Sequence, residues 1–172
     1  MTEPPPATAH PATLSDEALR ASCDETRTRR SGPGGQHRNK VETAVVLLHR
    51  PTGVVAEAAE RRSQDANRRV ALHRLRLRLA IEVRAAAGSG PSAAWRARVR
   101  GERIVVADDH PDLPGLLAEA LDQLQAAGWE AHRAAAALDV TSTQLVRFIR
   151  QTPAAWAAWT ARRREAGLRP LH

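Results

Sequence analysis

The chain has 172 residues, enough for one main domain and a small second one, and its 26 basic and 19 acidic side chains give a net charge of +7. A single cysteine excludes an intramolecular disulfide and a cysteine zinc site, and no apolar run is long enough to span a membrane. The N-terminus has no basic region followed by an apolar core, so we expect no secretory signal and a cytoplasmic protein.

The first part of the sequence predicts a small sheet and a long helix. Two apolar runs on either side of the turn Pro51-Thr52-Gly53 are typical of a β-hairpin. Ser63 is a suitable N-cap for a long helix. Apolar and basic residues alternate in the middle of this segment, as they would in a strand, but the segment is too long for a strand and favours a helix. The predicted elements are a helix over 14–22 capped by Thr13 or Ser15, an edge strand over 23–30, strands over 41–49 and 54–58, and a helix over 65–87.

The second part is predicted to be helical after one more strand over 98–107. Helices are expected over 114–128 and 129–138, from a capping box at Thr141, and from Pro153 to Gly167. The sequence therefore predicts an α+β fold: a small mixed β-sheet domain packed with one long helix, followed by a small all-α, helix-turn-helix-like region. The expected limits are 1–12 for a disordered N-terminus, 13–110 for the first domain and 111–172 for the helical region.

Positive charge is concentrated in the first part of the chain. Residues 20–103 hold 19 basic and 8 acidic residues, a net of +11, whereas the remainder holds 7 basic and 11 acidic residues, a net of −4. A polyanion partner is therefore expected for the first part. Residues 112–150 have a net charge of −2, so DNA is not the expected partner of the helices; protein or ribosome docking, or packing onto the first domain, is favoured.

The main motif is the glycine-rich stretch Arg30-Ser31-Gly32-Pro33-Gly34-Gly35-Gln36-His37-Arg38-Asn39-Lys40. Adjacent glycines let another molecule approach the main chain, and the nearby cations suggest that this molecule carries phosphates. A P-loop and a dinucleotide fingerprint are excluded by the position of Lys40 and by the strand expected next. A hydrolase triad would need Ser31 and His37, with nothing to orient them. Taken alone, the stretch could also be an ordinary turn between strands.

The stretch does not stand alone. With Val41-Glu42-Thr43-Ala44-Val45 it resembles the catalytic loop of class I peptide-chain release factors. The resemblance continues in register through Pro51-Thr52-Gly53-Val54-Val55, Glu60-Arg61-Arg62-Ser63-Gln64 and Asn67, so that it covers roughly residues 23–84. It implies a loop that enters the peptidyl-transferase centre of the large ribosomal subunit and triggers hydrolysis of the ester joining the peptide to the P-site tRNA.

The resemblance also implies roles for single residues. Gln36 would donate its main-chain N–H to the charge that develops on the ester, while Gly34 and Gly35 would permit the close approach. The counterpart of Gln36 in this family is often methylated on its amide nitrogen, so the resemblance implies methylation of Gln36 and a glutamine methyltransferase as a partner; no cofactor or metal is implied. The residues expected to contact ribosomal RNA are Arg30, Ser31, Gly32, Pro33, His37, Arg38, Asn39, Lys40, Arg61, Arg62, Ser63 and Gln64.

The sequence departs from a full release factor in one respect. We find no room for a domain that reads stop codons, so the chain looks closer to small codon-independent factors that rescue stalled ribosomes. It lacks their usual basic tail, with only Arg162-Arg163-Arg164 as a cluster. The expected protein is a monomeric, ribosome-dependent peptidyl-tRNA hydrolase. The alternative is a non-catalytic RNA- or ribosome-binding protein that uses the same basic domain.

Overall fold

The computed structural model describes residues 9–28 and 43–171 of the chain. The chain divides into two compact units. The first, the sheet unit, is Pro11–Leu79; the second, the helical unit, comprises the described residues from Ala80 onward with residues 9 and 10. The domain limits expected at residues 12 and 110 stay a prediction. In the described part of the chain, no helix is long and apolar enough to cross a membrane.

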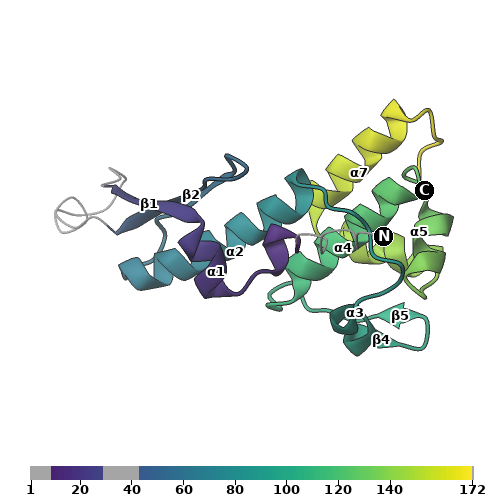
Figure 1. The fold of residues 1–172 in the computed structure, drawn as a ribbon, viewed down its shortest axis with the longest axis horizontal. Coiled ribbons are helices and arrows are strands. Elements are labelled where there is room, and N and C mark those ends of the chain that lie inside the picture. Colours follow the sequence, from purple (N-terminus) through teal and green to yellow (C-terminus); the bar gives the residue numbers. More distant parts are fainter. Residues whose placement is uncertain (1–8, 29–42, 172) are drawn as a thin grey trace, which may run out of the picture. The chain divides into compact units, whose positions relative to one another are not determined.

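The sheet unit follows the predicted order of elements (Figure 1). Its short first helix is capped by Ser15, whose Oγ accepts a hydrogen bond from the N–H of Ala18 at 3.2 Å. The elements are a 3-10 turn η1 (Pro11–Thr13), α1 (Asp16–Ala21), β1 (Cys23–Thr28), β2 (Ala44–His49), β3 (Val55–Ala58) and the long helix α2 (Gln64–Glu82).

The three strands form one sheet in the order β1-β2-β3, and both pairings are antiparallel. The predicted hairpin is confirmed, because β2 pairs with β3 and Gly53 takes φ +71° in the turn between them. Glycine reaches this left-handed angle at little cost, which explains its place in the turn. The polar strand β1 lies at the edge of the described sheet, as its sequence predicted.

Helix α2 packs against one face of this sheet, and its buried stripe explains why the segment is a helix rather than a strand. Asn67, Ala71, Leu75 and Leu79 recur at every fourth position, and each is fully buried. From the sheet, alternate residues such as Val45 and Leu47 on β2 and Ala56 and Ala58 on β3 are buried. The predicted α+β class is thus confirmed.

Helix α2 ends at Glu82, five residues before the predicted end at Ala87. The reason lies in the helical unit, where the next residues bond to side chains of α4 (Leu113–Ala126) instead of continuing the helix. The Asp122 carboxylate accepts from the N–H of Ala85 at 3.1 Å and from the Arg84 guanidinium at 2.6 Å. The Gln123 side-chain amide donates to the carbonyl of Gly88 at 2.8 Å. These partners satisfy backbone groups that a helix would otherwise use.

The predicted strand over 98–107 is wrong. Residues 93–104 form instead a short helix, α3 (Ala93–Arg98), and a tight hairpin of β4 (Val99–Arg100) and β5 (Arg103–Ile104). The fully buried Trp95 holds α3 in place, since its indole N–H donates to the carbonyl of Leu138 at 2.9 Å. Gly101, at φ +58°, reverses the chain between the two short strands.

The rest of the helical unit agrees with the predicted helices. They are α4, α5 (Ala131–Ala137), α6 (Ser142–Arg150) and α7 (Pro153–Glu165). Residues 138–141 join α5 to α6, with Asp139 at φ +54°. Thr141 caps α6, because its Oγ1 accepts from the N–H of Gln144 at 3.3 Å. Trp95 and Trp159 are fully buried, as expected for core residues.

Candidate functional site

The glycine-rich loop itself, with every predicted site residue from Arg30 to Lys40, lies outside the described residues. The roles of Gly34, Gly35 and Gln36 therefore stay predictions. The structure does describe where the loop begins and ends. β1 and β2 are paired up to Thr28 and Ala44, which are direct partners in the antiparallel register. Both ends of the segment between them are thus fixed at neighbouring positions on one end of the sheet.

A single buried side chain connects the returning end of the loop to the start of α2. The amide nitrogen of Asn67 donates to the carbonyls of Thr43 and Arg61, at 2.7 and 2.9 Å. Its amide oxygen accepts from the N–H of Arg61 at 2.8 Å. Asn67 is fully buried, so these bonds form where water cannot replace them. Asn67 therefore holds three segments together: the end of the loop, the turn at Arg61 and the helix.

The sequence resemblance included Asn67 but gave it no role. A signal was nevertheless present, because a polar residue shares the helix face of Ala71, Leu75 and Leu79. A buried amide in an apolar stripe needs hydrogen-bond partners, and main-chain groups of neighbouring segments can supply them. The identity of those segments could not be read from the sequence.

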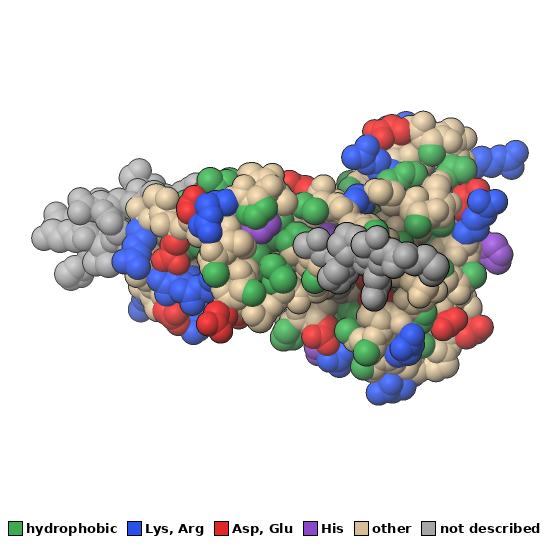
Figure 2. All heavy atoms as spheres, viewed as in Figure 1, with side chains coloured by type: hydrophobic (Ala, Val, Ile, Leu, Met, Phe, Trp, Pro, Cys, Tyr) green, Lys and Arg blue, Asp and Glu red, His purple; other side chains and the backbone are tan. Residues whose placement is uncertain are grey.

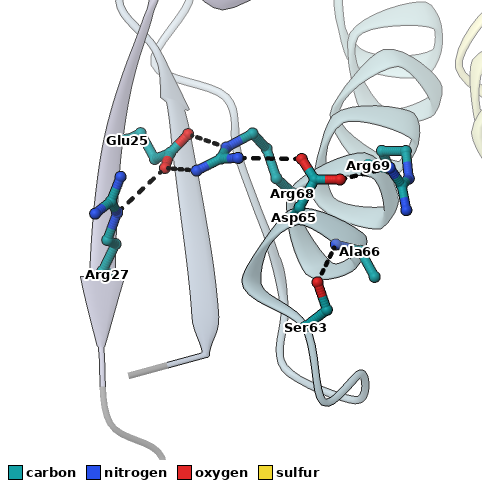
Figure 3. Close-up of polar contacts among 7 residues, drawn as sticks. All are labelled: Glu25, Arg27, Ser63, Asp65, Ala66, Arg68 and Arg69. Atoms are coloured by element: carbon teal, nitrogen blue, oxygen red, sulfur yellow. Dashed lines mark hydrogen bonds and ion pairs between the residues drawn. The ribbon is translucent and has the colours of Figure 1, made fainter. Parts of the chain in front are cut away.

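The four predicted RNA contacts Arg61, Arg62, Ser63 and Gln64 lie in the turn before α2 and at its first residue. The Asn67 side chain bonds to the carbonyls of both Arg61 and Thr43, so this turn lies close to the returning end of the loop. Arg61 and Arg62 are exposed, and neither guanidinium has a hydrogen-bond or ion-pair partner within the described residues. The Ser63 Oγ instead caps α2 by accepting from the N–H of Ala66 at 3.4 Å (Figure 3).

Several arginines of α2 are bound within the sheet unit rather than free. Arg68 donates to both carboxylate oxygens of Glu25 on β1, each at 2.8 Å, and to Asp65 at 3.3 Å (Figure 3). Arg76 donates to the carbonyl of Leu14 and to the carboxylate of Asp16 at 2.7 Å. In both cases the side chain is largely buried, so we assign it a structural role.

On the face drawn in Figure 2, basic and acidic side chains lie beside one another over the sheet unit. The loop-proximal Arg61 and Arg62 are the better candidates for contact with a polyanion, because the exposed Arg69 is paired with the Asp65 carboxylate at 2.5 Å. The net charge of the first part of the chain therefore overstates the number of its arginines that are free to bind phosphate.

The contact between Glu25 and Arg68 predicts a pH-dependent stability. Arg68 lowers the pKa of Glu25, so the stabilisation exists above the pKa of the unfolded carboxyl and is lost as the pH falls through the lower folded value. Glu25→Gln should lower the free energy of unfolding at pH 7 by about 1 kcal/mol. Urea midpoints measured at pH 7 and at about pH 2 should differ from those of the unsubstituted chain only at the higher pH.

Glu17→Gln is the matched control for this change. Glu17 is an exposed acid in the first turn of α1, and its side chain has no ion pair or hydrogen bond to any described residue. Its replacement removes only the weak interaction of a charge with the helix end, so the midpoint at pH 7 should shift less than in Glu25→Gln. If the urea midpoint of Glu25→Gln were still lower than that of the unsubstituted chain at about pH 2, the carboxylate charge would not be what stabilises the contact.

The described residues offer no imidazole at the base of the loop. His49 is at the opposite end of β2 from Ala44, where its Nδ1 lies 2.7 Å from the Oγ1 of Thr52 in the hairpin turn. Burial lowers the pKa of His49, which fits a structural role in the turn. The described residues provide two paired strand ends, at Thr28 and Ala44, and two exposed cations, Arg61 and Arg62. This arrangement is suited to positioning a loop on nucleic acid.

Comparison with known proteins shows which family the chain resembles. Residues 16–104 match the RF-1 domain. Over 80 residues the chain is 49% identical to peptide chain release factor 1 of Acidiphilium cryptum (strain JF-5), covering 44% of this chain and 23% of that protein. It is 42% identical over 85 residues to the chloroplastic peptide chain release factor PrfB1 of Arabidopsis thaliana, covering 45% and 19%.

A third relative, peptide chain release factor 2 of Acidovorax sp. (strain JS42), is 57% identical over 51 residues, which are 30% of this chain and 14% of that protein. The chain thus spans less than a quarter of the length of these curated relatives. No solved structure gives a significant match.

Proposed function

Because this chain belongs to the RF-1 domain family and is related to the class I peptide chain release factors, we propose that it hydrolyses the ester of peptidyl-tRNA on the ribosome. The observation that carries the proposal is the RF-1 match over residues 16–104, which includes an intact Gly34-Gly35-Gln36. A protein that only bound RNA would not need this sequence at the tip of its loop.

In the proposed mechanism the loop supplies hydrogen-bond donors and shape, and the ribosome supplies the rest of the site. The main-chain N–H of Gln36 donates to the oxygen that gains charge as water attacks the ester carbon. The Gln36 side chain limits the space beside that water, and Gly34 and Gly35 allow the backbone to approach without a clashing Cβ. The bond that breaks joins the peptide carbonyl to the tRNA ribose, and water supplies the hydroxyl and the proton.

The sheet unit contributes to this mechanism by positioning the two ends of the loop. A loop that acts by main-chain donors must hold them close to the reacting oxygen, and a displacement of about 1 Å can cost about 10²-fold in rate. The Thr28–Ala44 pairing and the Asn67 hydrogen bonds fix the two ends from which the loop extends. The exposed Arg61 and Arg62, with Arg30, Arg38 and Lys40 of the loop, would neutralise phosphates of large-subunit RNA.

A peptide-release assay tests the proposal. Purified protein should free a labelled peptide from ribosomes that hold peptidyl-tRNA in the P site, and should leave the same peptidyl-tRNA intact when ribosomes are omitted. Binding to ribosomes without any release would contradict the proposal and favour the alternative, a non-catalytic RNA- or ribosome-binding protein.

The finer proposal is that this release is codon-independent and serves the rescue of stalled ribosomes in the cytoplasm. The part of the chain that follows the RF-1 match folds as packed helices with exposed arginines on α6, and a contact of these arginines with RNA phosphates would not depend on the codon; this supports the finer proposal. Release should therefore be equally fast on complexes with a stop codon, a sense codon or no codon in the A site. Release confined to stop-codon complexes would overturn this finer proposal and leave the general one standing.

A further inference from the structure

The packing of α5 and α6 places one face of α6 in solvent. Two short helices joined by a tight turn resemble a helix-turn-helix, and in the DNA-binding form of that motif the second helix contacts the nucleic acid. Here the turn contains Asp139 in the left-handed region, and Thr141 caps the second helix. The side chains that pack the two helices together are all buried; they are Ala134, Ala135, Leu138, Val140, Leu145, Phe148 and Ile149.

The solvent face of α6 is polar and positively charged. Thr143, Arg147 and Arg150 are exposed, and their spacing of four and three residues places them along one side of the helix. The helix contains no acidic residue. Arg147 has no hydrogen-bond or ion-pair partner among the residues that the structure describes. Its charge is therefore available to a partner from outside the chain.

The acidic residues that give residues 112–150 a negative sum are mostly engaged elsewhere in the helical unit. Asp112 forms an ion pair with Arg98 at 2.7 Å, and the buried Asp122 forms one with Arg84 at 2.6 Å. Glu119 accepts from the N–H and the hydroxyl of Ser92, both at 2.6 Å. Three of the five acids in this range thus have partners from residues 84–98, and none of the three lies on α6. The net charge of −2 belongs to residues 112–150 as a whole, whereas α6 itself carries two arginines and no acidic residue.

Arg150 is held in a geometry suited to nucleic acid. Its guanidinium carbon lies 4.4 Å from the ring centroid of Trp156, at the start of α7. Trp156 in turn meets the buried Trp159 edge-on, with ring centroids 5.5 Å apart. A guanidinium stacked on an aromatic ring keeps its N–H groups free at its edge and loses less freedom when it binds a phosphate. The pair is therefore a preorganised cationic contact.

The same face offers little to an apolar partner. Among the described residues, the exposed large hydrophobic side chains are Leu48, Val55 and Val105, and none of them lies on α6 or α7. Protein interfaces of useful affinity bury apolar anchors at their centre. The α6 face is better suited to a sugar-phosphate backbone than to an apolar protein partner, because it presents two exposed arginines, a threonine and a stacked tryptophan.

We propose that Thr143, Arg147, Arg150 and Trp156 form a second RNA-binding surface, the α6 surface, separate from the glycine-rich loop. RNA rather than DNA is the inferred partner because the RF-1 domain of the same chain is proposed to act on the ribosome; in this respect the inference rests on the proposed function. Contact is made with phosphates, and it strengthens binding of the protein to structured RNA with little dependence on base sequence.

The test compares two double variants of the full chain that remove the same charge. Arg147→Gln with Arg150→Gln removes the cations of the α6 surface. Arg96→Gln with Arg103→Gln is the control, because both arginines are exposed in the helical unit and their side chains have no partner among the described residues. Circular dichroism should be unchanged in both, since the replaced side chains are not part of the core, and the thermal midpoint of the α6 variant should fall by only a few degrees through loss of the contact between Arg150 and Trp156.

Binding is measured by fluorescence anisotropy with a labelled 20-base-pair RNA duplex, and with the DNA duplex of the same sequence, at several salt concentrations. The α6 variant should bind the RNA about three- to thirtyfold more weakly than the unsubstituted chain, with a salt slope smaller by about 1 to 2. The control should keep the affinity of the unsubstituted chain. Equal affinity of the two variants, or a loss confined to the DNA duplex, would overturn the inference.

Release kinetics separate this inference from the proposed function. The α6 variant should need a higher protein concentration for half-maximal release and reach an unchanged maximal rate, because the loop is intact. A lower maximal rate with an unchanged half-saturating concentration would contradict a binding role. If the unsubstituted chain releases no peptide, the proposed function fails, and the RNA-duplex measurement still decides whether the α6 surface binds RNA.

Discussion

Replacing Gly35 with alanine should lower the rate of peptide release by about 10²- to 10³-fold, the cost expected when one donor to a developing oxyanion is displaced. In the proposed mechanism, the added Cβ restricts the backbone angles and occupies space that the RNA and the ester need, so the N–H of Gln36 would no longer reach the attacked carbonyl. The measurement is single-turnover release at saturating protein. Binding of the variant to ribosomes should fall far less than its rate of release.

Gly53→Ala is the matched control. Gly53 lies in the β2–β3 turn at φ +71°, and among the described residues no atom beyond its two chain neighbours lies within 4 Å of the place that a Cβ would take, so alanine there is strained without a steric clash. The expected result is a loss of about 1 kcal/mol in stability and an unchanged maximal rate of release. Equal rates for Gly35→Ala and the unsubstituted chain would show that the loop does not act through a close backbone approach.

Two changes at Gln36 separate its main chain from its side chain. Gln36→Pro removes the N–H and should lower release at least as much as Gly35→Ala, whereas Gln36→Ala keeps the N–H and should retain more of the rate. The same single-turnover assay ranks the two. A proline variant that released peptide faster than the alanine variant would contradict catalysis by the main-chain donor.

Replacing Asn67 with alanine should destabilise the sheet unit by about 3 kcal/mol or more. The change leaves the carbonyls of Thr43 and Arg61 and the N–H of Arg61 without their buried partner, at about 1 to 3 kcal/mol for each unsatisfied group. Urea unfolding measures the loss. Under conditions where the variant is folded, its maximal rate of release should also fall, because the returning end of the loop is no longer fixed.

Asn67→Asp keeps the size of the side chain and tests the hydrogen bonds themselves. At pH 7 the carboxylate can accept from the N–H of Arg61 but faces two carbonyl oxygens to which it cannot donate, so the stability should fall as in the alanine variant. A protonated carboxyl can donate once, so the deficit should narrow as the pH is lowered from about 7 to about 5. Arg69→Ala, at an exposed position of the same helix, should change stability by less than about 0.5 kcal/mol.

An unchanged urea midpoint in Asn67→Ala would show that the three segments are held by other contacts. A deficit of Asn67→Asp that did not narrow on acidification would assign the loss to packing rather than to hydrogen bonds.

Much of the sheet unit could be predicted from local sequence, because its elements are determined by short-range effects. The β2–β3 hairpin follows from two apolar runs and a glycine that reaches φ +71°, and the stripe through Ala71, Leu75 and Leu79 defines the buried face of α2. The helices from α4 to α7 followed in the same way from caps, breakers and apolar spacing.

The failures occurred where side chains far away in sequence compete with local preference. Nothing between Val83 and Ala87 stops a helix, yet Asp122 takes the N–H of Ala85 and ends α2 at Glu82. The apolar run at Ile104 suggested one strand, but Trp95 is anchored by the carbonyl of Leu138, and Gly101 reverses the chain. Such partners cannot be identified from a window of neighbouring residues.

By itself, the sequence determined the family of this protein and, through the family, the proposed chemistry: two glycines and a glutamine stand in a basic stretch between two strands, and further residues in register with them indicate the RF-1 family. Only the tertiary structure decided which groups support that chemistry. It showed that Asn67 fixes the end of the loop, that Arg68 and Arg76 are bound internally, and that Asp112 and Asp122 of the helical unit are paired with Arg98 and Arg84 rather than with α6. The physical reason is that charge and hydrogen bonding depend on distance in space, which the order of residues does not specify.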